Sequence, residues 1–461
     1  MRKLLAAVFA LALATAACIG GGSNDRTILV DFSHDEFSSM MVDNFPDRVD
    51  VTPGMSVVFK QTWTGEPHTV TAGTLVNEMI EKTEPWTRFF EGFEALAATA
   101  DLPDPDEPQG SARDLFGAID EAENEEMRDR FYEAFDDLRE MGVDLPDRRD
   151  PGDATFESLV QTADRESESA FEDLGIPWAL DETDDGEFFA TQNAGQPCYL
   201  DEGSPPEDAE RPCRDAQQQQ PAFTGDQSYY NSGIIPYEGP QGNTFRVKLA
   251  PEIAPGSYFF YCAVHGPNQA TEVRVRPEGS DIAEQEDVSR AAREQIGRFA
   301  EPMVEVYEDA RDGELEMQGQ TVEGPFAGLF APVFGAINEF IPGTINAKVG
   351  EPVTWKAMGW DHTISFDPPR YFPIIRFADD GAVSLNPQLN RPAGGHPEIP
   401  EQAGEGILRI DGGTYDGEGF YSSGVFSAEP YAEYTLRFSR PGTYRYACLL
   451  HPPMVGSVDV R

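Results

Sequence analysis

A repeat runs through the chain and divides it into two copies of one module. Residues 45–59 read FPDRVDVTPGMSVVF and residues 341–355 read IPGTINAKVGEPVTW, so that proline, glycine and alternating apolar positions recur in one register. Farther along, residues 255–265 read PGSYFFYCAVH and residues 441–451 read PGTYRYACLLH. Period-two alternation between Pro-Gly turns predicts antiparallel strands, and similarity at so many separated points indicates two modules of one fold. We therefore expect a mainly β protein built from two β-sandwiches.

The first copy is longer than the second, because an acidic stretch separates its two halves. Within this stretch, large apolar residues recur at helical spacing, at Trp86 and Phe89 and again at Phe131 and Phe135. We expect a large acidic α-helical insertion at about 75–190 that interrupts the first sandwich. It would be either a solvated decoration or a docking surface for a basic partner.

Composition places the remaining boundaries. The expected segments are a first domain at 27–276, a charged helical linker at 277–320 and a second domain at 321–461. Within the first domain, residues from about 191 to 224 form a loop rich in Pro, Gln and Glu that contains Cys198 and Cys213, neither of them near a histidine. Outside the cytoplasm, a local disulfide is the natural pairing for these two cysteines.

The first residues have the pattern of a targeting segment. Residues 1–17 combine two basic residues, an apolar run and small residues directly before Cys18, which is typical of a cleaved secretory signal. The segment resembles a bacterial or archaeal lipoprotein signal, in which Cys18 becomes the lipidated N-terminus and residues 18–26 form a flexible tether. The alternative is an ordinary secretory signal with an incidental cysteine. Either reading places the mature chain outside the cytoplasm, and the first anchors it to the outer face of the cell membrane.

Charge and cysteine content exclude some classes of function. The formal net charge is −48, from 82 acidic and 34 basic residues, which argues against nucleic-acid binding because neutralising phosphates requires basic patches. Five cysteines in 461 residues are too few for a disulfide scaffold or for tandem zinc ribbons.

The histidines and cysteines carry the chemistry. Four of the six histidines fall at matching points of the repeat. In the second copy, Cys448, His451 and Met454 lie within one short segment, and His362 comes from an earlier strand. A thiolate, two imidazoles and a thioether select copper in a trigonal site with a weak axial ligand. Zinc more often takes four strong ligands, and a Cys–His nucleophile pair leaves the methionine unexplained.

The first copy keeps His68, Cys262 and His265 but has no methionine nearby. Alignment on the final strand places Gln269 at the methionine position, whereas counting from the cysteine places Asn268 there. We favour Gln269, because strand alternation is costly to shift by one residue. A glutamine oxygen can serve as an axial ligand, and this harder donor should lower the reduction potential relative to the second copy. A site with only three ligands is the alternative.

Taken together, these motifs resemble the plastocyanin-like branch of the cupredoxins, the blue copper proteins. The resemblance rests on residues 349–355, on the histidine strand that follows and on the final loop at 442–458. It implies two Greek-key sandwiches with up to two type 1 copper ions, one in each domain. The implied ligands are His362, Cys448, His451 and Met454 in the second domain and His68, Cys262, His265 and Gln269 in the first.

The leading hypothesis for function is one-electron transfer between redox partner proteins, such as a cytochrome or a membrane oxidoreductase. Multicopper oxidases and copper nitrite reductases also join such modules, but they need further histidines, typically in His-x-His pairs. This sequence contains no His-x-His pair, so an enzyme is disfavoured. The alternative is copper storage or delivery, or a partner-binding module without a dedicated redox role.

Overall fold

The computed structural model describes most of the chain beyond residue 23. The described residues are 24–62, 64–97, 111–121, 125–152, 154–155, 158–159, 161–162, 181–182, 188–190, 195–203, 220–235, 242–317, 320–331, 335–369, 372–377, 383–389, 391–394, 408–427, 432–451 and 453–461. The fold is mainly β, with several mixed sheets consistent with cupredoxin-like β-sandwiches. Cys18, Cys213 and the signal and tether segments up to residue 23 lie outside the described residues.

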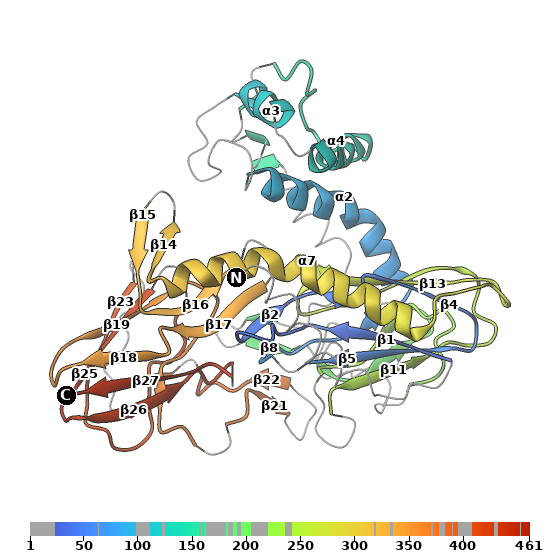
Figure 1. Ribbon diagram of the computed structural model, residues 1–461. Coiled ribbons are helices and arrows are strands. Elements are labelled where there is room, and N and C mark those ends of the chain that lie inside the picture. The colour runs from blue at the N-terminus through green and yellow to red at the C-terminus, as the bar shows by residue number, and fades with distance from the viewer. Residues whose placement is uncertain are drawn as a thin grey trace.

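Two sheets form the N-terminal module (Figure 1, blue and green). One has the order β11(Thr244–Lys248), β5(Ser56–Gln61), β1(Asp25–Val30), β3(Asn44–Phe45). The other has the order β4(Arg48–Val51), β13(Gly266–Val275), β12(Gly256–Cys262), β6(Thr71–Ala72), β10(Tyr229–Asn231), β9(Cys198–Leu200). Buried residues alternate with partly exposed ones along β1, β5 and most of β13, as expected for strands that bury one face.

Two sheets also form the C-terminal module (Figure 1, orange and red). One has the order β2(Ser39–Met41), β17(Gly335–Ile341), β16(Phe326–Phe330), β19(Val353–Ala357), β25(Ala432–Phe438), β23(Leu408–Tyr415). The other has the order β18(Thr344–Ala347), β27(Val455–Val460), β26(Gly442–Ala447), β20(Ser365–Phe366), β24(Tyr421–Ser422). Strand β2 precedes most of the N-terminal module in sequence but pairs with β17 of the C-terminal sheet.

The sequence repeat is also a repeat of strand pairing. β1 runs parallel to β5 as β16 runs parallel to β19, and β4 runs parallel to β13 as β18 runs parallel to β27. The hairpin of β12 and β13 corresponds to the hairpin of β26 and β27. Positions in one module can therefore be matched to positions in the other by register.

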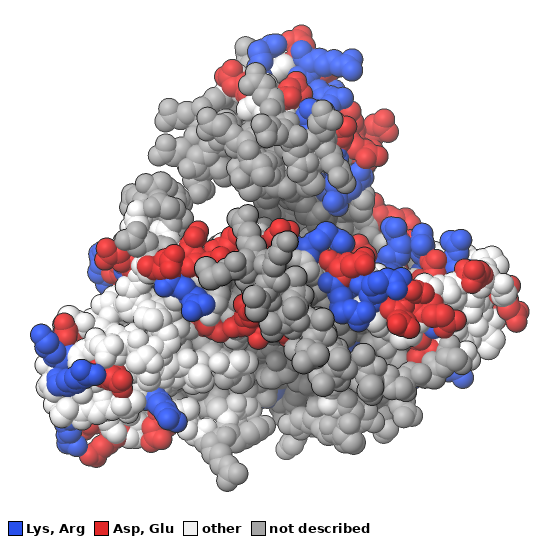
Figure 2. Space-filling view, viewed as in Figure 1, with Lys and Arg blue, Asp and Glu red and all other residues white. Residues whose placement is uncertain are grey.

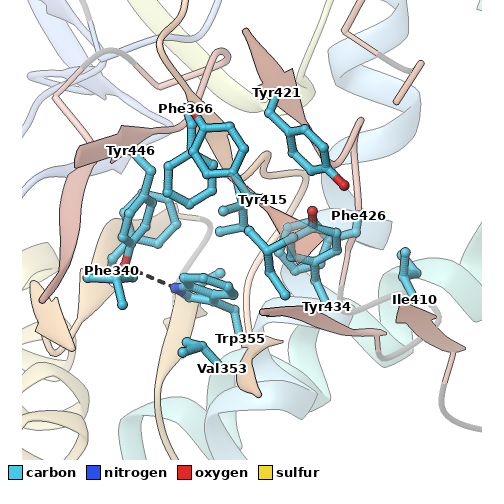
Figure 3. Close-up of a cluster of buried hydrophobic side chains, with 14 of the residues drawn as sticks. Phe340, Val353, Trp355, Phe366, Ile410, Tyr415, Tyr421, Phe426, Tyr434 and Tyr446 are labelled. Carbon is cyan, nitrogen blue, oxygen red and sulfur yellow. Dashed lines mark hydrogen bonds between the residues drawn. The ribbon is translucent and has the colours of Figure 1, made fainter. Parts of the chain in front are cut away.

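An aromatic cluster fills the C-terminal sandwich (Figure 3). Trp355 on β19 is completely buried, and its indole N–H donates a hydrogen bond of 2.9 Å to the hydroxyl of Tyr446 on β26. This bond satisfies the one polar atom of the largest side chain in the cluster and joins the two sheets. Cys448 and Met454 belong to the same cluster, so the candidate ligands extend directly from the core.

Helix α7(Gln285–Arg311) lies along both modules (Figure 1). It buries residues at three- and four-residue intervals, Ala292, Ile296, Ala300 and Met303. These pack in one cluster with side chains of both modules, among them Phe45 and Phe326. On the face that Figure 2 shows, acidic and basic side chains are interspersed across the middle of the molecule rather than separated by sign.

Among the described residues, helices α2(Thr74–Ala97), α3(Ala112–Glu121) and α4(Glu125–Glu140) lie in the range in which the sequence predicts helical structure. Their cluster buries Trp86, Phe89, Phe131 and Phe135, the residues whose spacing suggested helices. The same range also holds β7(Asp181–Glu182) and β8(Phe188–Ala190), and β8 pairs with β22(Val383–Leu385), the neighbour of β21(Ile375–Phe377). A further hairpin, β14(Glu314–Met317) with β15(Gln320–Glu323), follows α7.

The described part of the chain contains no helix that is both long and apolar enough to span a lipid bilayer.

Candidate metal centres

The strands bring the predicted residues of each module together. In the N-terminal module, His68 forms an isolated bridge with Ile235, Cys262 ends β12, and His265 lies in the turn before β13, which carries Gln269. The C-terminal module repeats this arrangement: His362 bridges Phe426, and Cys448, His451 and Met454 lie between β26 and β27. In both modules the ligating atoms of two histidines and one cysteine lie within 4.8 Å of one another.

The N-terminal site, called site 1, consists of His68, Cys262, His265 and Gln269. Cys262 Sγ lies 3.8 Å from His68 Nδ1 and 3.5 Å from His265 Nδ1. Gln269 Oε1 lies 2.9 Å from His68 Nδ1, so the amide oxygen points at the same place as the other three donors. All of these side chains are buried except for a small exposed edge of His265.

The C-terminal site, called site 2, consists of His362, Cys448, His451 and Met454. Cys448 Sγ lies 3.9 Å from His362 Nδ1 and 3.7 Å from His451 Nδ1, and the two Nδ1 atoms are 3.1 Å apart. The loop closes on itself: the Met454 N–H donates to the His451 carbonyl and the Cys448 N–H to the Met454 carbonyl. All four side chains are buried, which excludes water from the donors.

Both cysteines are held in the form that binds metals. Burial alone would raise the pKa of the Cys262 and Cys448 thiols, but the hydrogen bonds and charges of the neighbouring histidines hold both pKa values well below the usual range. The backbone N–H of Thr69 donates to Cys262 Sγ at 3.3 Å, and the N–H of Thr363 donates to Cys448 Sγ at 3.4 Å. Both effects favour the thiolate form of each cysteine.

The histidines differ in how strongly they hold a proton. Burial alone would lower the pKa of His68 and of His451, but contacts with a carboxylate and with the cysteine raise each to about 10. At His362, burial is the largest effect and lowers the pKa, which favours the neutral ring. A metal that binds at Nδ1 of His68 or His451 therefore displaces a proton.

Strand register settles which residue matches the methionine. In each hairpin the tyrosine after the Pro-Gly turn lies opposite a valine, Val273 in the first module and Val458 in the second. Four residues before these valines are Gln269 and Met454, which are both completely buried. Gln269 and Met454 are therefore equivalent positions, as the alignment on the final strand predicted.

A difference between the sites lies at Nε2 of the first histidine. The register of β1 on β5 and of β16 on β19 makes Asp31 equivalent to Gly328, and both have a positive φ, 60° and 67°. Asp31 Oδ2 lies 3.1 Å from His68 Nε2. In site 2, His362 Nε2 is buried without a hydrogen-bond partner among the described residues. Of the two first histidines, His68 has a carboxylate at Nε2, whereas His362 has none there among the described residues.

The Asp31 carboxylate is fully buried and fully satisfied. Oδ1 accepts from the N–H groups of Phe32 at 2.6 Å and Met41 at 3.0 Å. Oδ2 accepts from the Thr64 hydroxyl as well as from His68. Burial raises the pKa of Asp31, and the hydrogen bonds from His68, Thr64 and the Met41 N–H oppose that rise. The bond to an imidazole N–H fixes the ring of His68 and raises its basicity as a ligand.

The glycine equivalent to Asp31 leaves room for His362, the first histidine of site 2. An ideal Cβ on Gly328 would overlap Nε2 of His362. We expect Gly328→Ala to displace His362 and to abolish metal binding at site 2 while site 1 still binds. Gly350→Ala is the matched control, since Gly350 has a similar φ of 79° but nothing within 4 Å of its Cβ. Metal counted per protein in the two variants measures the difference, and equal metal content would contradict this role of Gly328.

Other residues that the sequence singled out lie elsewhere. Cys198 is disulfide-bonded, while Cys213 lies outside the described residues. His34 stacks on Phe37 with ring centroids 4.2 Å apart, which is a packing role. Cys262 and Cys448 are free thiols.

Sequence reasoning missed three features of the sites. Asp31 lies far from His68 in sequence, and only the strand pairing brings them together. The threonine after each first histidine is not a usual ligand for a soft metal, so nothing in the sequence indicated that it supports the sulfur. Glu66, discussed below, contacts a histidine of the other module, which a repeat cannot reveal.

The comparisons with known proteins find only weak similarities. No family model matches the chain, and no curated protein matches it. Among solved structures, a reduced-state mutant of amicyanin is 19% identical, over 27% of this chain and 73% of its own, with a TM-score of 0.12. Oxidised plastocyanin from Dryopteris crassirhizoma is 18% identical, over 27% of this chain and 89% of its own, with a TM-score of 0.15. Likenesses at this level carry no argument about function, which rests on the side-chain geometry.

Proposed function

We propose that this chain is a blue copper protein that carries single electrons between redox partners outside the cytoplasm. In this proposal, a lipid on Cys18 anchors it to the outer face of the cell membrane. The partners are proteins such as a cytochrome or a membrane oxidoreductase. The proposal assigns no chemistry beyond electron transfer, and turnover of oxygen or nitrite by the copper-loaded protein would contradict it.

The observation that supports it is the donor set of each module. One thiolate sulfur and two Nδ1 atoms converge in a buried place, with an amide oxygen or a thioether at the equivalent fourth position. Soft and borderline donors in this number fit copper, and they fit zinc less well because a closed zinc site takes four strong ligands. When bound, copper supplies a one-electron couple.

The protein's own residues hold the donors in place. The Thr69 and Thr363 hydroxyls accept from the N–H of the residue after each cysteine, at 2.7 Å and 2.9 Å, and their own N–H groups donate to the sulfurs. The cysteine is thus fixed from both sides in the same way in both modules. A site that keeps its donors fixed needs little rearrangement when its charge changes by one.

The residues around site 1 favour the oxidised form more than those around site 2. Each site has a carboxylate that contacts one histidine, Asp31 at His68 and Glu66 at His451. Site 1 differs in that Gln269 supplies an oxygen donor where site 2 has the Met454 thioether. Negative charge and harder donors stabilise the cupric state. We therefore propose a lower reduction potential at site 1 than at site 2.

Asp31→Asn tests this assignment, because it removes the charge and keeps the shape. We expect the potential of site 1 to rise by roughly 60 mV, the one-electron equivalent of a tenfold change in an equilibrium constant. The potential of site 2 should stay unchanged. Potentiometric titration with optical detection measures both, and a site 1 potential that falls or stays constant would contradict the assignment.

Reversibility separates electron transfer from storage or delivery. We expect repeated reduction and reoxidation of the loaded protein to return the full visible absorbance, with copper retained during incubation with a competing chelator. Loss of copper to the chelator on the same time scale, without a stable potential, would favour the delivery role instead.

A further inference from the structure

One carboxylate lies between the two candidate sites. Glu66 belongs to the N-terminal module, two residues before His68, yet its Oε1 lies 3.0 Å from Nε2 of His451 in site 2. Its other oxygen, Oε2, lies 3.9 Å from Nε2 of His265 in site 1. The same side chain therefore contacts the second histidine of both sites, in each case on the ring nitrogen that does not face the cysteine.

The backbone around Glu66 is packed tightly onto site 2. An ideal Cβ on Gly65 would come within 2.7 Å of the Leu450 carbonyl oxygen and 2.8 Å of His451 Cδ2. Gly65 also has a φ of 115°, which side chains rarely adopt. A glycine is thus required for the N-terminal module to approach the His451 segment this closely.

The turn that contains Gly65 and Glu66 is also hydrogen-bonded to residues that support site 1. The Gln61 amide donates to the Glu66 carbonyl at 2.5 Å. The Thr64 hydroxyl donates to Asp31, which in turn holds His68. The turn that carries Glu66 is therefore anchored to both candidate sites, and its position does not depend on a single contact.

Burial and charge at Glu66 agree with a bridging role. His451 is 1% exposed, and the side chain of His265 is only 10% exposed, so the Nε2 edges of both histidines face Glu66 rather than open solvent. Glu66 Oε1 lies within hydrogen-bond distance of His451 Nε2, and Oε2 lies at ion-pair distance from His265 Nε2. A charged acceptor between two imidazole N–H groups strengthens both contacts.

We propose that Glu66 bridges the two copper sites, so that an electron passes between them within one chain along His265, Glu66 and His451. This inference rests on the proposed function. Site 1 loses one electron and site 2 gains that electron, and no bond or proton is exchanged. The direction follows from Gln269, whose oxygen donor favours the oxidised state at site 1 more than the Met454 thioether does at site 2. Glu66 acts here as a positioning residue that holds the two histidine edges together.

The test uses the full-length protein with both sites loaded and oxidised. A pulse of reductant delivers less than one electron per molecule, and the visible bands of the two sites are followed over time. We expect a phase in which site 1 reoxidises as site 2 is reduced, at a rate independent of protein concentration. Glu66→Ala should lose this phase, whereas Glu66→Gln, which keeps the acceptor oxygen, should retain part of it.

Glu252→Gln is the matched control. Glu252 is exposed in the turn before β12, at the opposite end of that strand from Cys262, so the variant removes one acidic charge far from the bridge. It should keep the wild-type rate. Cys262→Ser, which has no site 1, should show no concentration-independent phase.

A measurement that involves no electron transfer tests whether the copper ions of site 1 and site 2 lie close together. In the fully oxidised protein, the two unpaired spins should broaden each other's resonance, and the broadening should disappear in Cys262→Ser. Two unperturbed spectra, or an unchanged exchange rate in Glu66→Ala, would overturn the bridge while leaving the proposed function intact. Failure of either module to take up copper would instead overturn the proposed function.

Discussion

Replacing Cys448 with serine is expected to remove one of two blue centres and leave the other. The Cys448 sulfur is the soft donor of site 2 and the source of the thiolate-to-copper absorption, and a serine hydroxyl is not ionised near neutral pH. Cys262→Ser should have the reciprocal effect, and the double variant should bind no blue copper. Because serine has the shape of cysteine with a smaller atom that can still accept from the Thr363 N–H, the apo fold should persist, as circular dichroism can check.

The two single variants are controls for each other. Each variant should lose about half of the visible absorbance and one equivalent of copper. The absorption band that remains in one variant should match the band that the other variant has lost relative to the wild type. A Cys448→Ser protein that keeps two blue centres would contradict the assignment of site 2. A double variant that remains blue would contradict both assignments.

Trp355→Ala should cause the largest loss of stability. Trp355 is completely buried at the centre of the aromatic cluster, and its removal leaves a cavity between the sheets and takes the hydrogen-bond donor away from Tyr446 (Figure 3). Large-to-small changes of this kind cost about 3–5 kcal/mol of unfolding free energy. Denaturant unfolding of the apo protein, followed by circular dichroism, should show this loss in the transition of the C-terminal module.

Val349→Ala is the control for Trp355→Ala, because Val349 is in the same module but 46% exposed. It should change the unfolding free energy by less than about 0.5 kcal/mol, as surface substitutions usually do. Equal effects of the two substitutions would contradict the central place of Trp355 in this core.

The repeat made much of the site predictable. Matching segments had to form matching strands, so His68 and His362 had to occupy the same place in each module, as did Cys262 and Cys448. The choice of Gln269 over Asn268 as the match of Met454 followed from strand alternation, because a one-residue shift would turn every side chain of β13 to the opposite face of the sheet. The mainly β fold followed from the same alternation.

A sequence repeat cannot predict the residues at which the two modules differ or the contacts between the modules. Asp31 and Gly328 are equivalent only through the parallel register of their strands, and neither residue type signals a metal site on its own. Glu66 binds a histidine of the other module, and no spacing within one copy encodes a contact between copies. Strand β2 pairs with the C-terminal sheet although it lies among N-terminal strands in sequence, which local pattern likewise cannot reveal.

The most direct test of the central claim is an anaerobic copper titration of the mature protein, read by visible absorbance and electron spin resonance. We expect saturation at two copper ions per chain, with two blue centres of different axial character. One should be lost in Cys262→Ser and the other in Cys448→Ser. A protein that stays colourless and binds no cupric ion would contradict the assignment of both copper sites.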